Sequence, residues 1–129
     1  MTPELTCLAW TALFTALMFV PYVLDRLAVR GIGDTMGYPD QPKPQSAWAL
    51  RMKAAHANAV ENLAVFATLV LIAHAADIHG QLTVTASALY LGSRVVHFLA
   101  YTFAVPWLRT LAFTGGLFAQ LVFAWLILA

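Results

Sequence analysis

Two stretches of the sequence, Leu5–Leu24 and Thr110–Ala129, contain no charged residue over 20 residues each. An α-helix rises about 1.5 Å per residue, so 20 residues cross the roughly 30 Å of hydrocarbon in a bilayer. Because that layer holds no water, a segment inside it must satisfy its own backbone hydrogen bonds, which favours a helix. The two stretches therefore predict membrane-spanning helices near the two ends of the chain.

The sequence between these stretches is also strongly apolar, at Asn62–Ala76 and Gln81–Pro106. Of the 129 residues, 61% are hydrophobic and 10% are charged, with a mean hydropathy of +0.76, whereas soluble domains carry about 25% charged residues. We therefore predict an all-α fold, an integral membrane four-helix bundle that forms one domain over residues 1–129. The expected helices are Pro3–Val29, Ala47–Ala76, Leu82–Ala104 and Pro106–Ala129.

Polar segments separate the expected helices. RGIGDTMGYPDQPKPQ, residues 30–45, is dense in Gly, Pro and Asp and predicts a water-exposed loop. Ser46 is the expected cap of the second helix, and Gly80, in the DIHGQ turn, is the expected stop of that helix. Four crossings place both termini on the same side of the membrane.

Composition and spacing exclude several classes of site. Cys7 is the only cysteine, so an intramolecular disulfide is excluded and most zinc sites are too. His74 and His79 lack metal-ligand spacing with a cysteine or another histidine, and no metal is expected. A net charge of +1 argues against nucleic acid as a partner.

The Lys and Arg residues predict the orientation. Five of the seven lie around the first connection, namely Arg26, Arg30, Lys43, Arg51 and Lys53, and the DIHGQ turn has none. The positive-inside rule then places the first loop in the cytoplasm and both termini on the opposite side. The third connection, next to Arg109, would lie on the cytoplasmic side too.

Each of the last three expected helices carries one polar face, at 100° per residue. On the second helix, Asn58 and Asn62 lie within about 20° of Arg51 and Glu61 about 80° away, whereas His56 points to the other side. The third helix has a stripe within about 60°, formed by Tyr90, Arg94, His97 and Tyr101. The fourth has a similar face, formed by Arg109, Phe113, Gly116 and Gln120.

A charged side chain in the middle of a membrane costs about 2.5–3.5 kcal/mol on insertion scales, so it faces protein or trapped water. Arg51, Arg94 and Arg109 are expected to meet the carboxylate of Glu61 in a polar cavity. Such a Glu–Arg contact can simply hold the bundle together. One carboxylate cannot neutralise three guanidiniums, however, and the cationic surplus predicts an anionic ligand.

The same residues form three short motifs. R-x4-H-x-N-x2-E contains Arg51, His56, Asn58 and Glu61, R-x2-H-x3-Y contains Arg94, His97 and Tyr101, and R-T contains Arg109 and Thr110. With the chain length, the four-helix layout and the basic first loop, these motifs resemble the membrane-associated proteins in eicosanoid and glutathione metabolism (the MAPEG family). Within that family the chain resembles a bacterial-type microsomal glutathione transferase, and the resemblance covers the chain from the second helix to the start of the fourth.

This resemblance implies a homotrimer that binds glutathione as co-substrate between adjacent subunits, at the cytoplasmic side. It implies that Asn58 and Glu61 hold the amino end of the tripeptide, with Arg51 at the rim. His97, Tyr101 and Arg109 would engage its carboxylates and cysteinyl part.

The resemblance also separates catalytic from structural roles. Arg109, with Tyr101, is the candidate for stabilising the thiolate, and Thr110 is a candidate hydroxyl donor. Arg94 matches a structural position that would pair with the second helix. Ala57 stands where several relatives carry an arginine, so the site is less cationic than theirs.

The leading hypothesis is therefore a membrane-bound glutathione transferase or peroxidase that acts on hydrophobic electrophiles or lipid hydroperoxides. The alternative is a non-catalytic membrane protein of the same fold that binds or scaffolds lipids. A small transporter has less support, because the four helices show no inverted repeat.

Overall fold

The computed structural model describes all residues, 1–129, and every regular element in it is a helix. The helices are α1 (Pro3–Leu17), α2 (Phe19–Met36), α3 (Ala47–Ala75), α4 (Gln81–Thr102) and α5 (Pro106–Leu128). Four helical spans, with α1 and α2 counted as one, are long and apolar enough to cross a membrane. The all-α prediction is confirmed, and the chain is an integral, multi-pass membrane protein.

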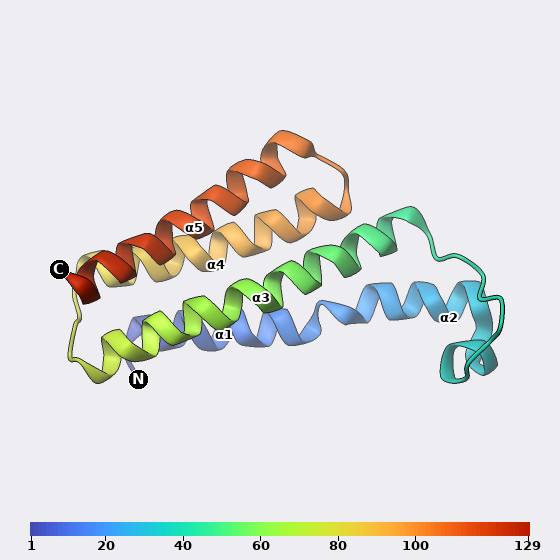
Figure 1. The fold of residues 1–129 in the computed structure, drawn as a ribbon, viewed down its shortest axis with the longest axis horizontal. Coiled ribbons are helices and arrows are strands. Elements are labelled where there is room, and N and C mark those ends of the chain that lie inside the picture. The colour runs from blue at the N-terminus through green and yellow to red at the C-terminus, as the bar shows by residue number, and fades with distance from the viewer.

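The helices lie side by side along one axis, so that the bundle has two distinct ends (Figure 1). Both termini and the α3–α4 turn lie at one end. The α2–α3 and α4–α5 connections lie at the other end, which we call the loop end. The two termini therefore lie at the same end of the bundle, which is consistent with four crossings.

The first span is not the continuous helix that was expected over Pro3–Val29. It breaks between α1 and α2 at Met18, whose N–H bonds to the Thr15 carbonyl at 3.3 Å instead of continuing the α-helical pattern. The cause lies one turn further on: Pro21 has no N–H to donate to the Leu17 carbonyl, and its ring crowds the preceding turn.

The α2–α3 connection is shorter than expected, because α2 runs to Met36 inside the segment assigned to a loop. Gly31 interrupts α2 with φ 76° and ψ 171°. That conformation is almost confined to glycine, because a Cβ would clash there. The chain reverses at Gly31, and Ile32–Met36 forms one further helical turn.

The start of α3 is held by a distant carboxylate. Ser46 occupies the expected cap position, but its side chain makes no capping hydrogen bond to α3. Its hydroxyl and its backbone N–H instead donate to the two carboxylate oxygens of Asp25, at 2.5 and 3.1 Å. Gln45 adds a 2.7 Å hydrogen bond to the Tyr22 carbonyl, so α2 fixes where α3 begins.

The two remaining turns use residues with positive φ that are not glycine. Helix α3 ends at Ala75, and Asp77 (φ 57°) makes the reversal that had been assigned to Gly80; Gly80 instead precedes α4. Helix α4 ends at Thr102, two residues earlier than expected, and Ala104 (φ 57°) turns the chain into Pro106 and α5.

Close packing joins α4 to α5. A Cβ placed on Gly115 would lie 2.8 Å from the hydroxyl of Ser93, so only glycine allows the two helices to approach this closely. At the opposite end from the loops, the hydroxyl of Thr83 donates to the buried carboxylate of Glu4. This hydrogen bond ties α1 to the start of α4.

Candidate functional site

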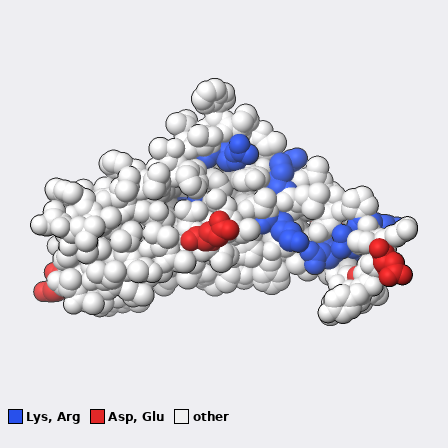
Figure 2. Space-filling model, in the orientation of Figure 1, with Lys and Arg blue, Asp and Glu red and all other residues white.

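The Lys and Arg side chains visible in Figure 2 gather toward the loop end of the molecule. None of them forms an ion pair with a carboxylate. The only close pairs of acidic and basic groups involve His79, with Glu4 and Asp77, at the far end. The cationic groups of the loop end are therefore not neutralised within the chain.

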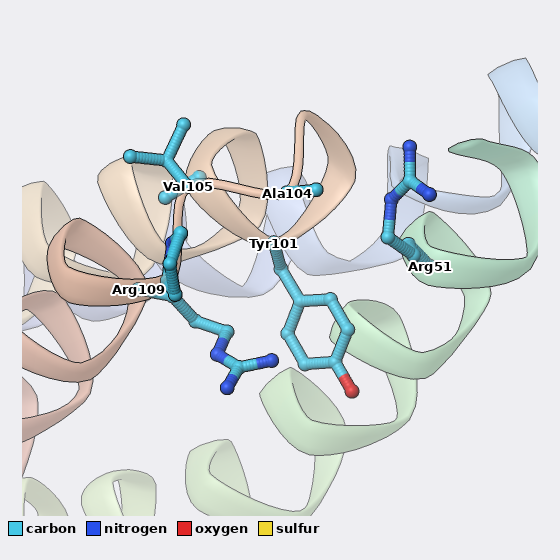
Figure 3. A pocket seen from close by; sticks show the side chains of 7 residues that line it. Arg51, Tyr101, Ala104, Val105 and Arg109 are labelled. Carbon is cyan, nitrogen blue, oxygen red and sulfur yellow. The ribbon is translucent and has the colours of Figure 1, made fainter. Parts of the chain in front are cut away.

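A cavity of about 160 Å³ opens at the loop end between α3, α4 and α5. Figure 3 shows Tyr101 of α4 projecting between Arg109 of α5 and Arg51 of α3. The guanidinium carbon of Arg109 lies 5.0 Å from the centre of the Tyr101 ring, a cation–π contact worth about 0.5–1 kcal/mol at an exposed site. The cavity is otherwise apolar, with Ala100, Ala104, Val105 and Pro106 in its wall.

The Nε atom of Arg51 makes the hydrogen bond that holds this side chain at the cavity. Its Nε donates to the Thr102 carbonyl at 2.9 Å, one of the last carbonyls of α4, which have no partner within their own helix. The outer guanidinium nitrogens of Arg51 have no protein partner, and Arg109 has no hydrogen bond to protein. The cavity thus presents two guanidiniums and no carboxylate.

Arg94 lies deeper in the bundle and is only 2% exposed. Its Nη2 donates to the side-chain oxygen of Asn58 at 2.7 Å and lies 3.3 Å from Nδ1 of His97. An arginine nitrogen can only donate, so Nδ1 of His97 accepts and the imidazole proton lies on Nε2. The predicted pairing of Arg94 with the second span is confirmed, although its partner is an amide rather than a carboxylate.

Glu61 does not meet the arginines, which corrects the expectation of a shared Glu–Arg cavity. Its side chain is exposed on α3 and has no ion-pair partner. Within a single chain, Glu61 therefore has no positively charged partner.

The sequence profile of the MAPEG family matches residues 4–129. The chain belongs to the MAPEG family. No curated protein and no solved structure matches the chain.

Within this MAPEG chain, the structure divides the predicted site residues other than Glu61 into three groups. Arg51, Tyr101 and Arg109 share the cavity. Asn58 and His97 stand one layer deeper and contact Arg94. Thr110 is exposed, and its hydroxyl donates to the Pro106 carbonyl of its own helix at 3.2 Å, so its hydroxyl proton is already engaged.

Two contacts around the site were not anticipated. The Tyr22 hydroxyl makes a 2.7 Å hydrogen bond with Nδ1 of His56, which joins α2 to α3. The Gln120 amide donates to the Asn62 carbonyl at 3.2 Å, which joins α5 to α3. The position of His56 on the side of its helix away from Arg51 was the available signal for the first contact, but nothing in the sequence identifies Tyr22 as its partner.

Proposed function

We propose that this MAPEG protein is a glutathione transferase of the bacterial microsomal type, which joins glutathione to hydrophobic electrophiles or uses it to reduce lipid hydroperoxides. The observation that carries the proposal is the cavity with two guanidiniums, Arg51 and Arg109, and no carboxylate. Glutathione has two carboxylates and one ammonium group, so its net negative charge complements this cavity.

The cavity of one chain is too small for the whole tripeptide. Its volume of about 160 Å³ falls below the roughly 300 Å³ at which ligand pockets begin. We propose that a second copy completes it, within a homotrimer, and that the exposed Glu61 of one copy comes to face the arginines of the next. This arrangement would also remove Glu61 from contact with lipid.

The hydrogen bonds that these residues already make suggest which group of glutathione each residue holds. The side-chain oxygen of Asn58 already accepts from Arg94, so its amide N–H remains to donate to a carboxylate. Glu61 would take the ammonium group. His97 offers Nε2–H as a donor, while Arg51 at the rim takes the second carboxylate.

Arg109 is the proposed catalytic cation, with Tyr101 as the ring that positions it. A guanidinium beside a thiol favours the thiolate, and the thiolate is the nucleophile. In conjugation, the sulfur forms a bond to the electrophilic carbon and the leaving group departs with its electron pair. In peroxide reduction, two glutathione molecules become the disulfide, and the hydroperoxide becomes an alcohol and water.

The lipophilic substrate would approach from the bilayer. A groove of about 370 Å³ between α4 and α5 is lined mainly by apolar side chains, among them Leu89, Val96, Leu108 and Leu111. By the positive-inside rule, the loop end and its cavity would face the cytoplasm, where glutathione is made.

Ultraviolet difference spectroscopy tests the proposal. Glutathione added to detergent-purified protein is expected to produce thiolate absorbance, and Arg109→Ala should abolish it. Lys53→Gln is the matched control, because it removes an exposed cation of the same end without touching the cavity. Absence of the signal at saturating glutathione, with binding verified by calorimetry, would exclude the transferase.

A second candidate is a non-catalytic lipid-binding protein, which the apolar groove favours by itself. In that case the protein would retain lipid through purification and give no thiolate signal. Leu111→Asn, which places an amide in the groove, should then abolish lipid retention, whereas Arg109→Ala should not.

A further inference from the structure

The last part of α2, Ile32–Met36, folds back beside the rest of the helix (Figure 1). Gly31 makes the reversal, with its φ of 76°. The hydroxyl of Thr35 then donates to the Arg26 carbonyl at 3.3 Å, and Nε of Arg30 donates to the Lys43 carbonyl at 2.7 Å. These two hydrogen bonds pin the segment at both ends, so its orientation is defined.

The folded-back turn and the residues just after it carry large apolar side chains that are mostly exposed. Ile32 is 75% exposed, Met36 78% and Tyr38 fully exposed. Ile32 and Met36 are four residues apart and share one face of the turn, whereas Asp34 lies on the opposite face. The turn is therefore amphipathic.

The depth of this turn follows from the first span. The uncharged stretch ends at Leu24, and Asp25 and Arg26 mark the point where the hydrocarbon layer ends. Because Thr35 bonds to the carbonyl of Arg26, the turn returns to that level, just outside the hydrocarbon. This is the headgroup layer, where amphipathic helices bury their apolar face and where tyrosine is enriched.

Unpaired cations surround the turn. Arg26, Arg30 and Lys43 have no carboxylate within ion-pairing distance. Both arginines hydrogen-bond to protein only through Nε, so their Nη1 and Nη2 donors remain available to a phosphate. Asp25 accepts hydrogen bonds from Ser46, and the two acids of the segment itself, Asp34 and Asp40, are exposed and form no ion pair with these cations.

We propose that residues 31–43 form an interfacial anchor that binds the anionic headgroup layer of the membrane. Ile32, Met36 and Tyr38 insert among the headgroups and upper acyl chains, and Arg30 and Lys43 bind lipid phosphates. This proposal concerns a different surface from the cavity and does not depend on glutathione chemistry.

Spin labelling in nanodiscs tests the anchor. In a Cys7→Ser background, which removes the only native cysteine, a nitroxide is attached at Met36→Cys or, as matched control on the opposite face of the same turn, at Asp34→Cys. With phosphatidylglycerol present, the label at position 36 is expected to collide more with dissolved oxygen than with a water-soluble nickel complex. The label at position 34 should show the reverse.

Removing the charge of Lys43, or the anionic lipid, tests whether the anchor binds anionic headgroups. Lys43→Gln is expected to lower the ratio of inserted to aqueous label at position 36 about fivefold in anionic nanodiscs, and phosphatidylcholine alone should lower it too. Lys53→Gln, outside the anchor, should leave the ratio unchanged. A label at position 36 that remains aqueous would show that the turn faces water or another protein, which overturns the anchor. Insertion that is equal in both lipids would overturn the assignment to anionic headgroups.

Discussion

The buried contact between Arg94 and Asn58 predicts an asymmetry between removing one partner and removing the other. Asn58→Ala takes away the 2.7 Å acceptor of a guanidinium that is 2% exposed. The same guanidinium already has an Nε without any partner, and the 3.3 Å contact with His97 is all that would remain. Arg94→Met instead removes the buried charge and fills a similar volume.

The magnitudes follow from the cost of an unpaired buried charge. A hydrogen bond to a charged group contributes about 1.5–3 kcal/mol, so we expect Asn58→Ala to lower the free energy of unfolding by about 2–3 kcal/mol. Replacing a buried charged group by a well-packed apolar one is often neutral or stabilising, so Arg94→Met should cost under about 1 kcal/mol. In the Arg94→Met background, Asn58→Ala should then cost less than about 1 kcal/mol.

The assay is a double-mutant cycle, with unfolding by sodium dodecyl sulfate in mixed micelles followed by far-ultraviolet circular dichroism. Glutathione is left out, so that ligand binding does not contribute to stability. Thr68→Ala is the matched control: it removes a polar side chain on the same helix, and the Thr68 hydroxyl donates only to the Ala64 carbonyl of that helix. Its cost should be the same in both backgrounds.

A coupling energy below about 0.5 kcal/mol, which is the usual error of additivity, would refute the reasoning. It would mean that water or lipid solvates Arg94 as well as Asn58 does. A large destabilisation by Arg94→Met would refute it from the other side, because the guanidinium would then stabilise the bundle rather than require Asn58.

Three further predictions concern packing, capping and the α2–α3 contact. Gly115→Ala should lower the free energy of unfolding by about 1–3 kcal/mol through overpacking. Adding Ser93→Ala should recover most of this loss, because the added Cβ would lie 2.8 Å from the Ser93 hydroxyl but 3.8 Å from its Cβ. A loss that is not recovered would point to a backbone clash. Asp25→Ala should accelerate hydrogen exchange of the first amides of α3 by about tenfold, as expected for a lost cap of about 1 kcal/mol. The control Asp34→Ala should not, because it removes an exposed acid without a hydrogen bond to α3. Equal exchange rates in the two variants would contradict the role of Asp25. Tyr22→Phe, which removes the hydroxyl that binds His56, should lower stability by about 0.5–1.5 kcal/mol in the same micelle titration, and no change would show that His56 is equally well solvated without it.

Helix α3 shows that the ends of a membrane span could be predicted from the sequence. Its limits, Ala47–Ala75, differ by one residue from those expected, because a polar segment followed by a long apolar run leaves little choice in a membrane. The break at Met18 and the glycine reversal at Gly31 were not predicted. Each has a local cause, Pro21 and the conformational freedom of glycine, but proline and glycine also occur in places where the chain continues straight.

The site was predicted in composition but not in arrangement. The family resemblance correctly paired Arg94 with the second span, and Arg51 and Arg109, which helical periodicity placed together, do line one cavity. The same reasoning put Glu61 among them, although its side chain is exposed. A wheel gives an angle around one helix, whereas the pairing of two side chains depends also on depth and on the rotation of the neighbouring helix.

The sequence by itself determined that this chain crosses a membrane four times, because hydrocarbon accepts only long uncharged segments whose backbone is bonded within each helix. It also determined the surplus of cations at one end. Only the tertiary structure decided which of those cations form hydrogen bonds with other side chains. Arg94 is enclosed by Asn58 and His97, while Arg51 and Arg109 keep free guanidinium nitrogens toward a cavity. The physical reason is that hydrogen bonds depend on atomic distances between helices, and these distances arise only when the helices pack.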